Sequence, residues 1–188
     1  MSKATLRTFI AYVEDLPGVL NRVTSLLRRR NYNIVSLTVG RTEREGVSRM
    51  TIVLEADDDG ARRIEANLYK LVNVLWVQNA SDASAMAREL ALIKVRTTSV
   101  NRSEIMRLCD VFRARVVDVG PEALVAEITG TADKIDGLVD VLRPFGIAEM
   151  VRTGIVAMVR SAEASAGDGL PSSPQPPAGA SSGSFRAA

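Results

Sequence analysis

One order of predicted elements occurs twice along this chain of 188 residues, and it restricts the possible folds more than any other feature. Apolar residues recur at strand or helix spacing so that strand, helix, strand, strand, helix and strand follow one another. In the first half these elements are predicted at residues 6–13, 18–30, 34–39, 49–55, 60–72 and 74–77. In the second half they are predicted at residues 89–97, 101–113, 116–119, 124–129, 133–142 and 147–158, the last with a break at Gly154. The repeat predicts an α+β chain of two ferredoxin-like βαββαβ domains in tandem, each with two helices on one face of an antiparallel sheet.

The composition divides the chain into three parts. We expect the first domain at residues 5–80 and the second at 84–161, with a polar stretch over residues 79–88 between the two repeats. From residue 162 onward Gly, Ser and Pro dominate and the apolar periodicity ends. Such a composition cannot bury enough apolar surface to fold, so residues 162–188 are predicted to be a disordered tail.

The first strand predicts self-association. Its residues Phe9, Ala11 and Val13 alternate with residues that are also apolar, Leu6, Ile10 and Tyr12. A strand that is apolar on both faces is usually covered on both, and two helices cover only one. Each unit has only about 75 residues, which is small for an independent core. We therefore expect a homodimer, formed either sheet to sheet or edge to edge.

The composition argues against an enzyme that acts alone. The chain has no histidine, which excludes histidine bases and most zinc sites. Cys109, the only cysteine, lies on the apolar helical stripe of Ile105, Leu108 and Phe112, so a buried structural thiol is predicted. The carboxylates of residues 57–59 precede Gly60 and a helix, where they are predicted to cap the helix rather than bind metal. Asn101, with Glu104 three residues later, is predicted to cap the helix of the second unit.

Charge and hydropathy favour a soluble, cytoplasmic protein. The 24 basic and 22 acidic residues nearly balance, which gives little attraction to nucleic acid or to a membrane surface. No apolar run approaches a membrane span, and the N-terminus lacks a signal peptide. The basic run at residues 28–30 ends a predicted helix, where it complements the helix dipole. An RNA-binding βαββαβ domain stacks bases on strand aromatics, and residues 49–54 contain none.

The loop at residues 14–18 (EDLPG) is the best candidate for a binding site. It joins the first predicted strand to the first predicted helix. A helix N-terminus presents backbone N–H groups without partners, and these suit a carboxylate such as that of a free amino acid. The loop alone favours the plainer interpretation, a tight Pro-Gly turn that only starts a helix.

Several runs resemble a known family. DLPGVLNRV at residues 15–23 resembles the first turn of an ACT domain, the small βαββαβ module that binds amino acids. RNYNIVSLTV at residues 30–39 and SRMTI at 48–52 resemble the small regulatory subunit of acetolactate synthase (acetohydroxyacid synthase). LVNV at 71–74 and RELALIKV at 88–95 fit the same family. The resemblance covers residues 6–160 and departs from the family at Asp15, where Asn is common, and at Asn31, where Gly is common.

The resemblance implies a regulatory subunit without an active site or cofactor of its own. Its partner would be a large catalytic subunit that carries thiamine diphosphate, magnesium and FAD. The small subunit would activate this partner and confer feedback inhibition by valine or a related branched-chain amino acid. The implied effector-binding residues lie in the first loop and at the start of the second predicted strand: Asp15, Leu16, Pro17, Gly18, Val19, Leu20, Asn33, Ile34 and Val35.

Within this site the effector carboxylate is expected on the N–H groups of Gly18, Val19 and Leu20. Asn33 would bind the backbone-like end of the ligand, facing the loop of a second protomer if the site lies at a dimer interface. The ligand motif also fits a stand-alone ACT-type amino-acid sensor that acts on another target. A tandem of nucleic-acid-binding modules is the third hypothesis, and it requires strong, salt-dependent binding to a polynucleotide.

Overall fold

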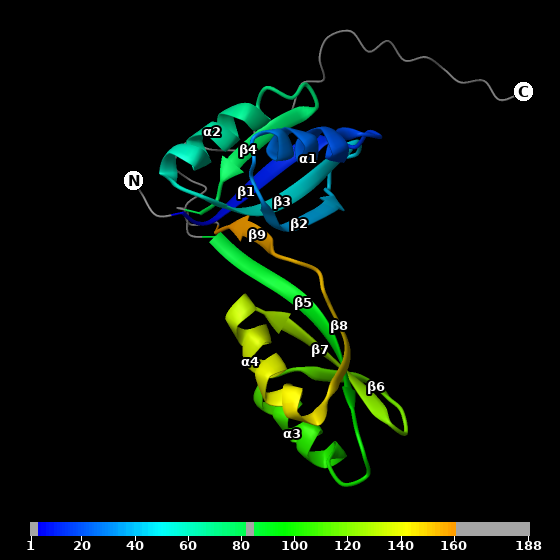
Figure 1. Ribbon diagram of the computed structural model, residues 1–188. Coiled ribbons are helices and arrows are strands. Elements are labelled where there is room, and N and C mark those ends of the chain that lie inside the picture. Colours follow the sequence, from blue (N-terminus) through cyan, green and yellow to red (C-terminus); the bar gives the residue numbers. More distant parts are fainter. Residues whose placement is uncertain (1–3, 82–84, 161–188) are drawn as a thin grey trace, which may run out of the picture.

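The computed structural model describes residues 4–81 and 85–160. They form two units that lie one above the other, each with an antiparallel sheet and two helices (Figure 1). The first unit contains β1 (Thr5–Glu14), α1 (Val19–Arg29), β2 (Ile34–Arg41), β3 (Val47–Ala56), α2 (Asp58–Leu68) and β4 (Val74–Asn79). The second contains β5 (Ala85–Arg96), α3 (Arg102–Val111), β6 (Arg115–Val119), β7 (Ala123–Gly130), α4 (Ala132–Leu142), a short 3₁₀ turn (Arg143–Phe145), β8 (Ile147–Arg152) and β9 (Val156–Val159).

Both sheets have the strand order of the ferredoxin-like fold. The first sheet runs β2-β3-β1-β4 and the second runs β6-β7-β5-β8, with β9 paired to one end of β5. The predicted fold class, two βαββαβ units in tandem, is confirmed. The predicted tail, residues 162–188, lies outside the described residues, as do residues 82–84 at the expected junction between the domains.

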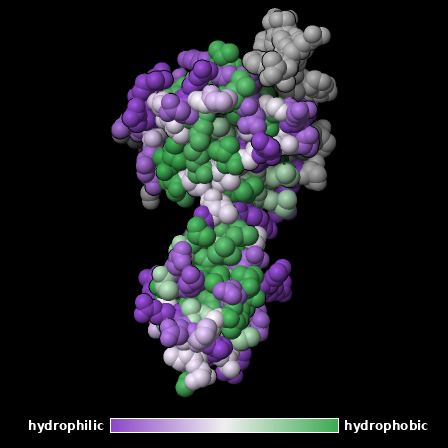
Figure 2. All heavy atoms as spheres, turned by 90° about the vertical axis from the view of Figure 1, so that its right-hand side faces the viewer, coloured by the Kyte–Doolittle hydropathy of each residue, from purple (hydrophilic) through white to green (hydrophobic). Residues whose placement is uncertain are grey.

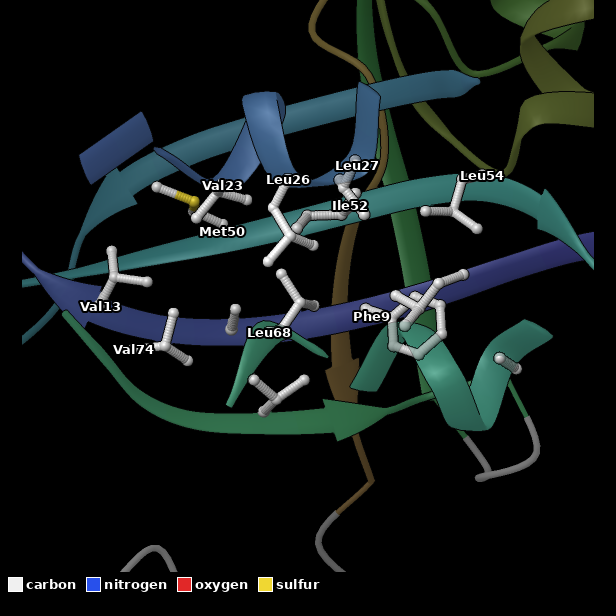
Figure 3. Close-up of a cluster of buried hydrophobic side chains, with 14 of the residues drawn as sticks. Phe9, Val13, Val23, Leu26, Leu27, Met50, Ile52, Leu54, Leu68 and Val74 are labelled. Carbon is white, nitrogen blue, oxygen red and sulfur yellow. The ribbon is translucent and has the colours of Figure 1, made fainter. Parts of the chain in front are cut away.

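Each unit has its own aliphatic core between the sheet and the helices. In the first unit, alternate residues of β1 and β3 face α1 and α2, and Phe9, Leu27 and Leu54 are completely buried there (Figure 3). In the second unit Ile93, Ile128 and Leu138 are buried in the same way. Cys109 is fully buried in this second core, which confirms the predicted structural thiol.

The prediction was wrong about the boundary of the first strand of the second unit. Residues 79–88 were expected to be a polar stretch, but β5 already begins at Ala85. The first four residues of β5 pair with β9, from Ala85 opposite Val159 to Arg88 opposite Val156. This tertiary pairing supplies the hydrogen bonds that make residues 85–88 a strand. The predicted break of the last strand at Gly154 is confirmed, because β8 ends at Arg152 and β9 starts at Val156.

A third, smaller apolar cluster joins the two units. β9 lies beneath the first sheet, against the face that carries no helices (Figure 1). Ile10, Ala80 and Ala157 are buried there, and Tyr12 and Trp76 pack against them with their rings edge to face. The guanidinium of Arg49 donates to the Ala157 carbonyl and lies 5.8 Å from the centroid of the Tyr12 ring.

The two predicted helix caps have different outcomes. Asp57 caps α2, because its carboxylate accepts a hydrogen bond of 2.7 Å from the Gly60 N–H. Asn101 precedes α3, but its side chain does not cap the helix. Its Oδ1 atom instead accepts from the Thr98 N–H at 2.7 Å, which closes the preceding loop. The spacing of Asn101 and Glu104 could not distinguish these two uses of the same side chain.

Candidate functional site

The loop between β1 and α1 is open where the sequence predicted a binding site. Asp15, Leu16, Pro17 and Gly18 are all exposed, and Leu16 keeps 55% of its surface accessible. Gly18 has φ of +85°, a left-handed conformation that L side chains rarely adopt. A Cβ atom built on Gly18 would meet nothing within 4 Å. The backbone conformation therefore favours glycine at this position, and open space lies beside it.

Backbone donors are available at the start of α1. Over the residues that the structure describes, the N–H groups of Gly18, Leu20 and Asn21 have no acceptor in the chain. The Val19 N–H donates to the Leu16 carbonyl at 3.3 Å, so this predicted donor is engaged in a long turn bond. Two of the three expected carboxylate donors, Gly18 and Leu20, are thus free.

Asp15 is held beside this opening. Its Oδ1 atom accepts a hydrogen bond from the Ser48 hydroxyl at 3.1 Å, and its Oδ2 atom lies 3.6 Å from Nε of Arg41. The backbone N–H of Asp15 donates to the Gly46 carbonyl at 2.8 Å. The Arg41 cation offsets the negative charge, although both side chains are well exposed and the attraction is screened by water. Ser48 and Arg41 were not identified from the sequence, because they follow Asp15 by more than 25 residues.

The second half of the predicted site lies at the other end of the sheet. β1 and β2 both run antiparallel to β3, so they run parallel to each other. β1 ends with Glu14 opposite Val47, and β2 ends at the same level with Arg41 opposite Ser48. Ile34 and Val35 begin β2 and Asn33 directly precedes it, about 20 Å away along a strand that rises about 3.3 Å per residue. One chain does not bring the loop and Asn33 together.

A hollow surrounds the start of β2. It has a volume of about 520 Å³ and is lined by the outer face of α1 together with the turn that follows: Asn21, Thr24, Ser25, Arg28, Asn31, Tyr32, Asn33 and Ile34. The contribution of α1 was not predicted from the sequence. One feature of the sequence could have indicated this contribution. The residues of α1 that line the hollow are mostly small and polar, and they recur at spacings of three and four residues. In the same turn Asn31 has φ of +60°, a left-handed conformation that Asn adopts more readily than most other residues with a side chain.

The helix-free face of the first sheet is partly covered by the same chain, so a second copy has less of it to cover than the sequence predicted. This face was expected to be covered by dimerisation, but β9 and Ile155 of the same chain cover much of it. Thr51 and Val53 on this face are 2% and 1% exposed. The outer edge of β2 remains, because within the described ranges β2 pairs only with β3. Val35 and Val39 on this strand are 52% and 42% exposed.

Metal ligands, a reactive thiol and a membrane-spanning helix are the other features to consider in the described part of the chain. No group of three or more metal-ligating side chains occurs among residues 4–81 and 85–160. Burial, with a smaller effect of the Asp110 carboxylate, raises the pKa of the Cys109 thiol, which disfavours the reactive thiolate. No helix in the described part of the chain is both long and apolar enough to cross a bilayer.

Comparison with known proteins identifies the family. A family model described as "AHAS small subunit-like ACT domain" matches residues 9–76, and one described as "Small subunit of acetolactate synthase" matches residues 88–161. A probable acetolactate synthase small subunit from Archaeoglobus fulgidus is 47% identical over 153 residues, which is 81% of this chain and 96% of that protein. This chain belongs to the acetolactate synthase small subunit family.

Other members of the small-subunit family agree. The acetolactate synthase small subunit of Mycolicibacterium smegmatis is 45% identical over 161 residues, covering 85% of this chain and 95% of that protein. The crystal structure of the small subunit from Thermotoga maritima superposes with a TM-score of 0.78 at 38% identity, covering 83% of this chain and 98% of that one. The resemblance drawn from the sequence is confirmed, and both βαββαβ units belong to the family's own architecture.

Proposed function

We propose that this chain is a regulatory subunit that activates the large catalytic subunit of acetolactate synthase in branched-chain amino acid biosynthesis. It confers feedback inhibition by valine or a related branched-chain amino acid. The observation that carries the proposal is the pair of free backbone donors at Gly18 and Leu20, beside open space, in a member of this family. The chain is not itself the enzyme, and thiamine diphosphate, magnesium and FAD belong to the catalytic partner.

The effector carboxylate binds at the start of α1 in this proposal. The free N–H groups of Gly18 and Leu20 donate to it, and the positive end of the α1 dipole adds to the attraction. Asp15, fixed by Ser48, lies close enough to the loop to accept from the effector's ammonium group. Exposed apolar side chains at Leu16 and Leu20 provide a surface for a branched aliphatic side chain.

The complete site requires two copies of the chain. A two-fold axis through the free edge of β2 would pair this strand antiparallel with its copy. The partner copy's strand would then begin at the level of Arg41, which is also the level of the Gly18 loop in this chain. This arrangement brings Asn33, Ile34 and Val35 of one protomer to the loop of the other. The free edge of β2 therefore favours a homodimer formed edge to edge.

The main test is reconstitution with the cognate large subunit and titration of valine, leucine and isoleucine. The small subunit alone is expected to show no pyruvate condensation, and its addition should raise turnover. Gly18→Asp should raise the half-inhibitory concentration of valine at least about 100-fold, the loss of about 2.7 kcal/mol of binding, while activation persists. Asn33→Ala should raise it about fivefold, through loss of about 1 kcal/mol.

Two matched variants make this test specific. Gly18→Asn tolerates the left-handed conformation without adding charge, so it separates backbone strain from repulsion of the carboxylate. Val100→Asp adds the same charge to the exposed loop before α3 and should leave inhibition unchanged. If valine inhibits Gly18→Asp as well as wild type, the effector site lies elsewhere. If this chain co-purifies with another target instead of the large subunit, it is a stand-alone sensor.

Mixing two defective chains tests whether the site spans a dimer. Gly18→Asp damages the loop, and Asn33→Trp blocks the start of β2 by size. A mixed dimer would contain one site with both defects and one intact site, so inhibition should return to about half of its normal extent. No recovery, with mixed dimers verified by mass, would place the whole site within one chain.

A further inference from the structure

The start of β2 contacts the second unit through two hydroxyl groups. The Thr38 hydroxyl donates to the connection between β8 and β9, at 3.3 Å from the Thr153 carbonyl and 3.1 Å from the Ile155 carbonyl. The Ser36 hydroxyl accepts from the Ile155 N–H at 3.0 Å. We refer to these contacts of Ser36 and Thr38 with residues 153–155 as the clasp.

Gly154 makes this close approach possible. Its φ is +83°, and a Cβ atom there would lie 2.4 Å from Oγ of Ser36 and 3.3 Å from Oγ1 of Thr38. Any other residue at this position would be strained and would push the connection away from β2. From the sequence, Gly154 was predicted only to break the last strand.

On one side, the clasp adjoins the proposed effector contacts. Asn33, Ile34 and Val35 directly precede Ser36, and the pairing of β2 with β3 shifts register between Ile34 and Ser36. Val35 is therefore the extra residue of a β-bulge, a place where a strand bends and re-aims its side chains. An amino acid that binds at residues 33–35 acts on the strand one residue away from the clasp.

On its other side, the clasp is connected to β5 and α4 of the second unit through residues 152 and 153. The Thr153 N–H donates to the Leu90 carbonyl at 3.0 Å, and the Thr153 hydroxyl accepts from the Leu90 N–H at 3.1 Å. Arg152 forms ion pairs with Glu89 of β5 and with Asp136 of α4. A displacement of residues 153–155 is thus passed directly to β5 and α4.

The space next to the clasp leaves room for such a displacement. A cavity of about 510 Å³ lies between the two units, with Val35 and Leu37 on one wall and Arg152 and Ala132 on the other. The units do not pack tightly against each other there. The tilt of the second unit about the small apolar cluster at Ala157 is set by few contacts, and the polar ones include the clasp and the hydrogen bond from Arg49 to the Ala157 carbonyl.

We infer that Ser36 and Thr38 are coupling residues, which pass the state of the amino-acid site at the start of β2 to the second unit through residues 153–155. This inference rests on the proposed function, because it concerns how the proposed inhibition is transmitted. Effector contact at residues 33–35 fixes the bulge, and the clasp then holds the second unit in one orientation. Without the clasp the amino acid still binds, but its binding has a weaker effect on the rest of the chain.

The test separates binding from inhibition in the full chain. Thr38→Val and Ser36→Ala remove the hydroxyl groups and keep most of the side-chain volume, and Thr38→Ser retains the donor. Valine binding to the small subunit is measured by calorimetry, and inhibition is measured after reconstitution with the large subunit. The Ser36→Ala/Thr38→Val double variant should bind valine within about twofold of wild type. Its coupling, the ratio of half-inhibitory concentration to dissociation constant, should weaken by about 2- to 30-fold.

Three further variants complete the experiment. Thr38→Ser should restore coupling, and Thr5→Val makes the same substitution at an exposed position of β1 and should behave as wild type. Gly154→Ala should weaken coupling at least as much as the double variant. Hydrogen exchange of the Ile155 amide provides an independent measurement, since Ser36→Ala removes its acceptor and should speed its exchange at least about threefold.

The outcomes distinguish this inference from the proposed function. If valine neither binds to nor inhibits the wild type, both fall together. If the wild type responds to valine and the double variant shows unchanged coupling, the clasp does not transmit inhibition and only this inference is overturned. If the double variant loses valine binding itself, Ser36 and Thr38 support the site rather than couple it, and the inference is again wrong.

Discussion

The two units have the same order of elements, yet the loops before their first helices differ. Before α1 the loop turns through Gly18, and the N–H groups of Gly18 and Leu20 are left without acceptors. Before α3 the Thr98 N–H donates to Oδ1 of Asn101, and the Asn101 N–H donates back to the Thr98 hydroxyl at 3.3 Å. The first loop is open to an external carboxylate, and the second loop is closed by its own side chains.

Neighbouring residues increase this difference. The guanidinium of Arg102, at the start of α3, donates to the Gly120 and Pro121 carbonyls of the β6–β7 turn at 2.9 Å and 2.6 Å, and to the Thr97 hydroxyl at 3.5 Å. At the first loop, Arg41 and Ser48 contact the Asp15 side chain, and the N–H groups of Gly18 and Leu20 keep no acceptor among the described residues. The shared fold therefore does not determine binding. The Pro-Gly turn leaves N–H groups at the start of α1 without acceptors in the described part of the chain. At the start of α3 the Arg102 N–H donates to the Thr98 carbonyl at 3.2 Å, and Thr98 and Asn101 bond to each other.

The helix-free faces of the two sheets also differ. In the first sheet Ile10 and Val53 on this face are buried, partly under β9. In the second sheet the corresponding face carries Leu92 beside Val151, and Val151 is 58% exposed. Figure 2 shows apolar side chains gathered on this side of the lower unit. The same chain thus covers one sheet on both faces and leaves the other covered mainly on its helix side.

The largest expected effects test whether the two units are separate folding units. Leu54→Ala should destabilise the first unit by about 2–5 kcal/mol, because Leu54 is completely buried in its core. Ile128→Ala should do the same to the second unit. Hydrogen exchange resolved by residue should assign each loss to its own unit, because in the described part of the chain a small apolar cluster around Ala157 and a few hydrogen bonds join the two units.

Exposed valines are the controls for these core variants. Val72→Ala in the first unit and Val100→Ala in the second remove the same kind of side chain at positions that are 89% exposed. Each should change stability by less than about 0.5 kcal/mol. If Leu54→Ala lowers the protection of both units equally, the chain unfolds as one cooperative block and the comparison of two separate units is broken.

The next effect concerns the ion pairs of Arg152, which join β8 to β5 and α4. Burial disfavours the Arg152 charge, but hydrogen bonds to Glu89 and Asp136 outweigh it and raise the pKa of the guanidinium. Glu89 is only 8% exposed, so Arg152→Met would leave a buried carboxylate without its cation. We expect a loss of about 1–3 kcal/mol in the free energy of unfolding, measured by urea denaturation.

Arg143 provides the comparison for Arg152. It pairs with Asp140 one turn away on the surface, with 72% of each side chain accessible. Arg143→Met should therefore cost less than about 0.5 kcal/mol. Equal losses for Arg152→Met and Arg143→Met would show that the network at Glu89 contributes no more than a surface pair.

The sequence predicted local elements well because local forces determine them. The apolar spacing of α1 predicted residues 18–30, and the helix spans Val19–Arg29. Asp57 was correctly identified as a cap from its place before Gly60. Contacts across the chain were not predictable in this way. Residues 85–88 form a strand only because β9 lies alongside, more than 60 residues later.

The candidate site shows the same limit. The sequence predicted that Gly18 and Asn33 belong to one binding site, but the topology places them at opposite ends of the sheet. Nothing in the spacing of these residues indicates the level at which each lies along the strands. Ser36 and Thr38 resemble ordinary strand residues, and their role depends on residues 153–155, which approach only in the folded chain.

The smallest expected effect compares the second helix of each unit. The N-cap residue of α2 is Asp57, whose side chain accepts from Gly60, whereas the N-cap residue of α4 is Thr131, whose side chain makes no capping bond. Asp57→Ala should lower the free energy of unfolding by about 1 kcal/mol, because a helix donor loses its acceptor. Thr131→Ala should cost less than about 0.5 kcal/mol. Equal costs in thermal or urea denaturation would mean that the Asp57 hydrogen bond adds nothing to the helix beyond what an uncapped start provides.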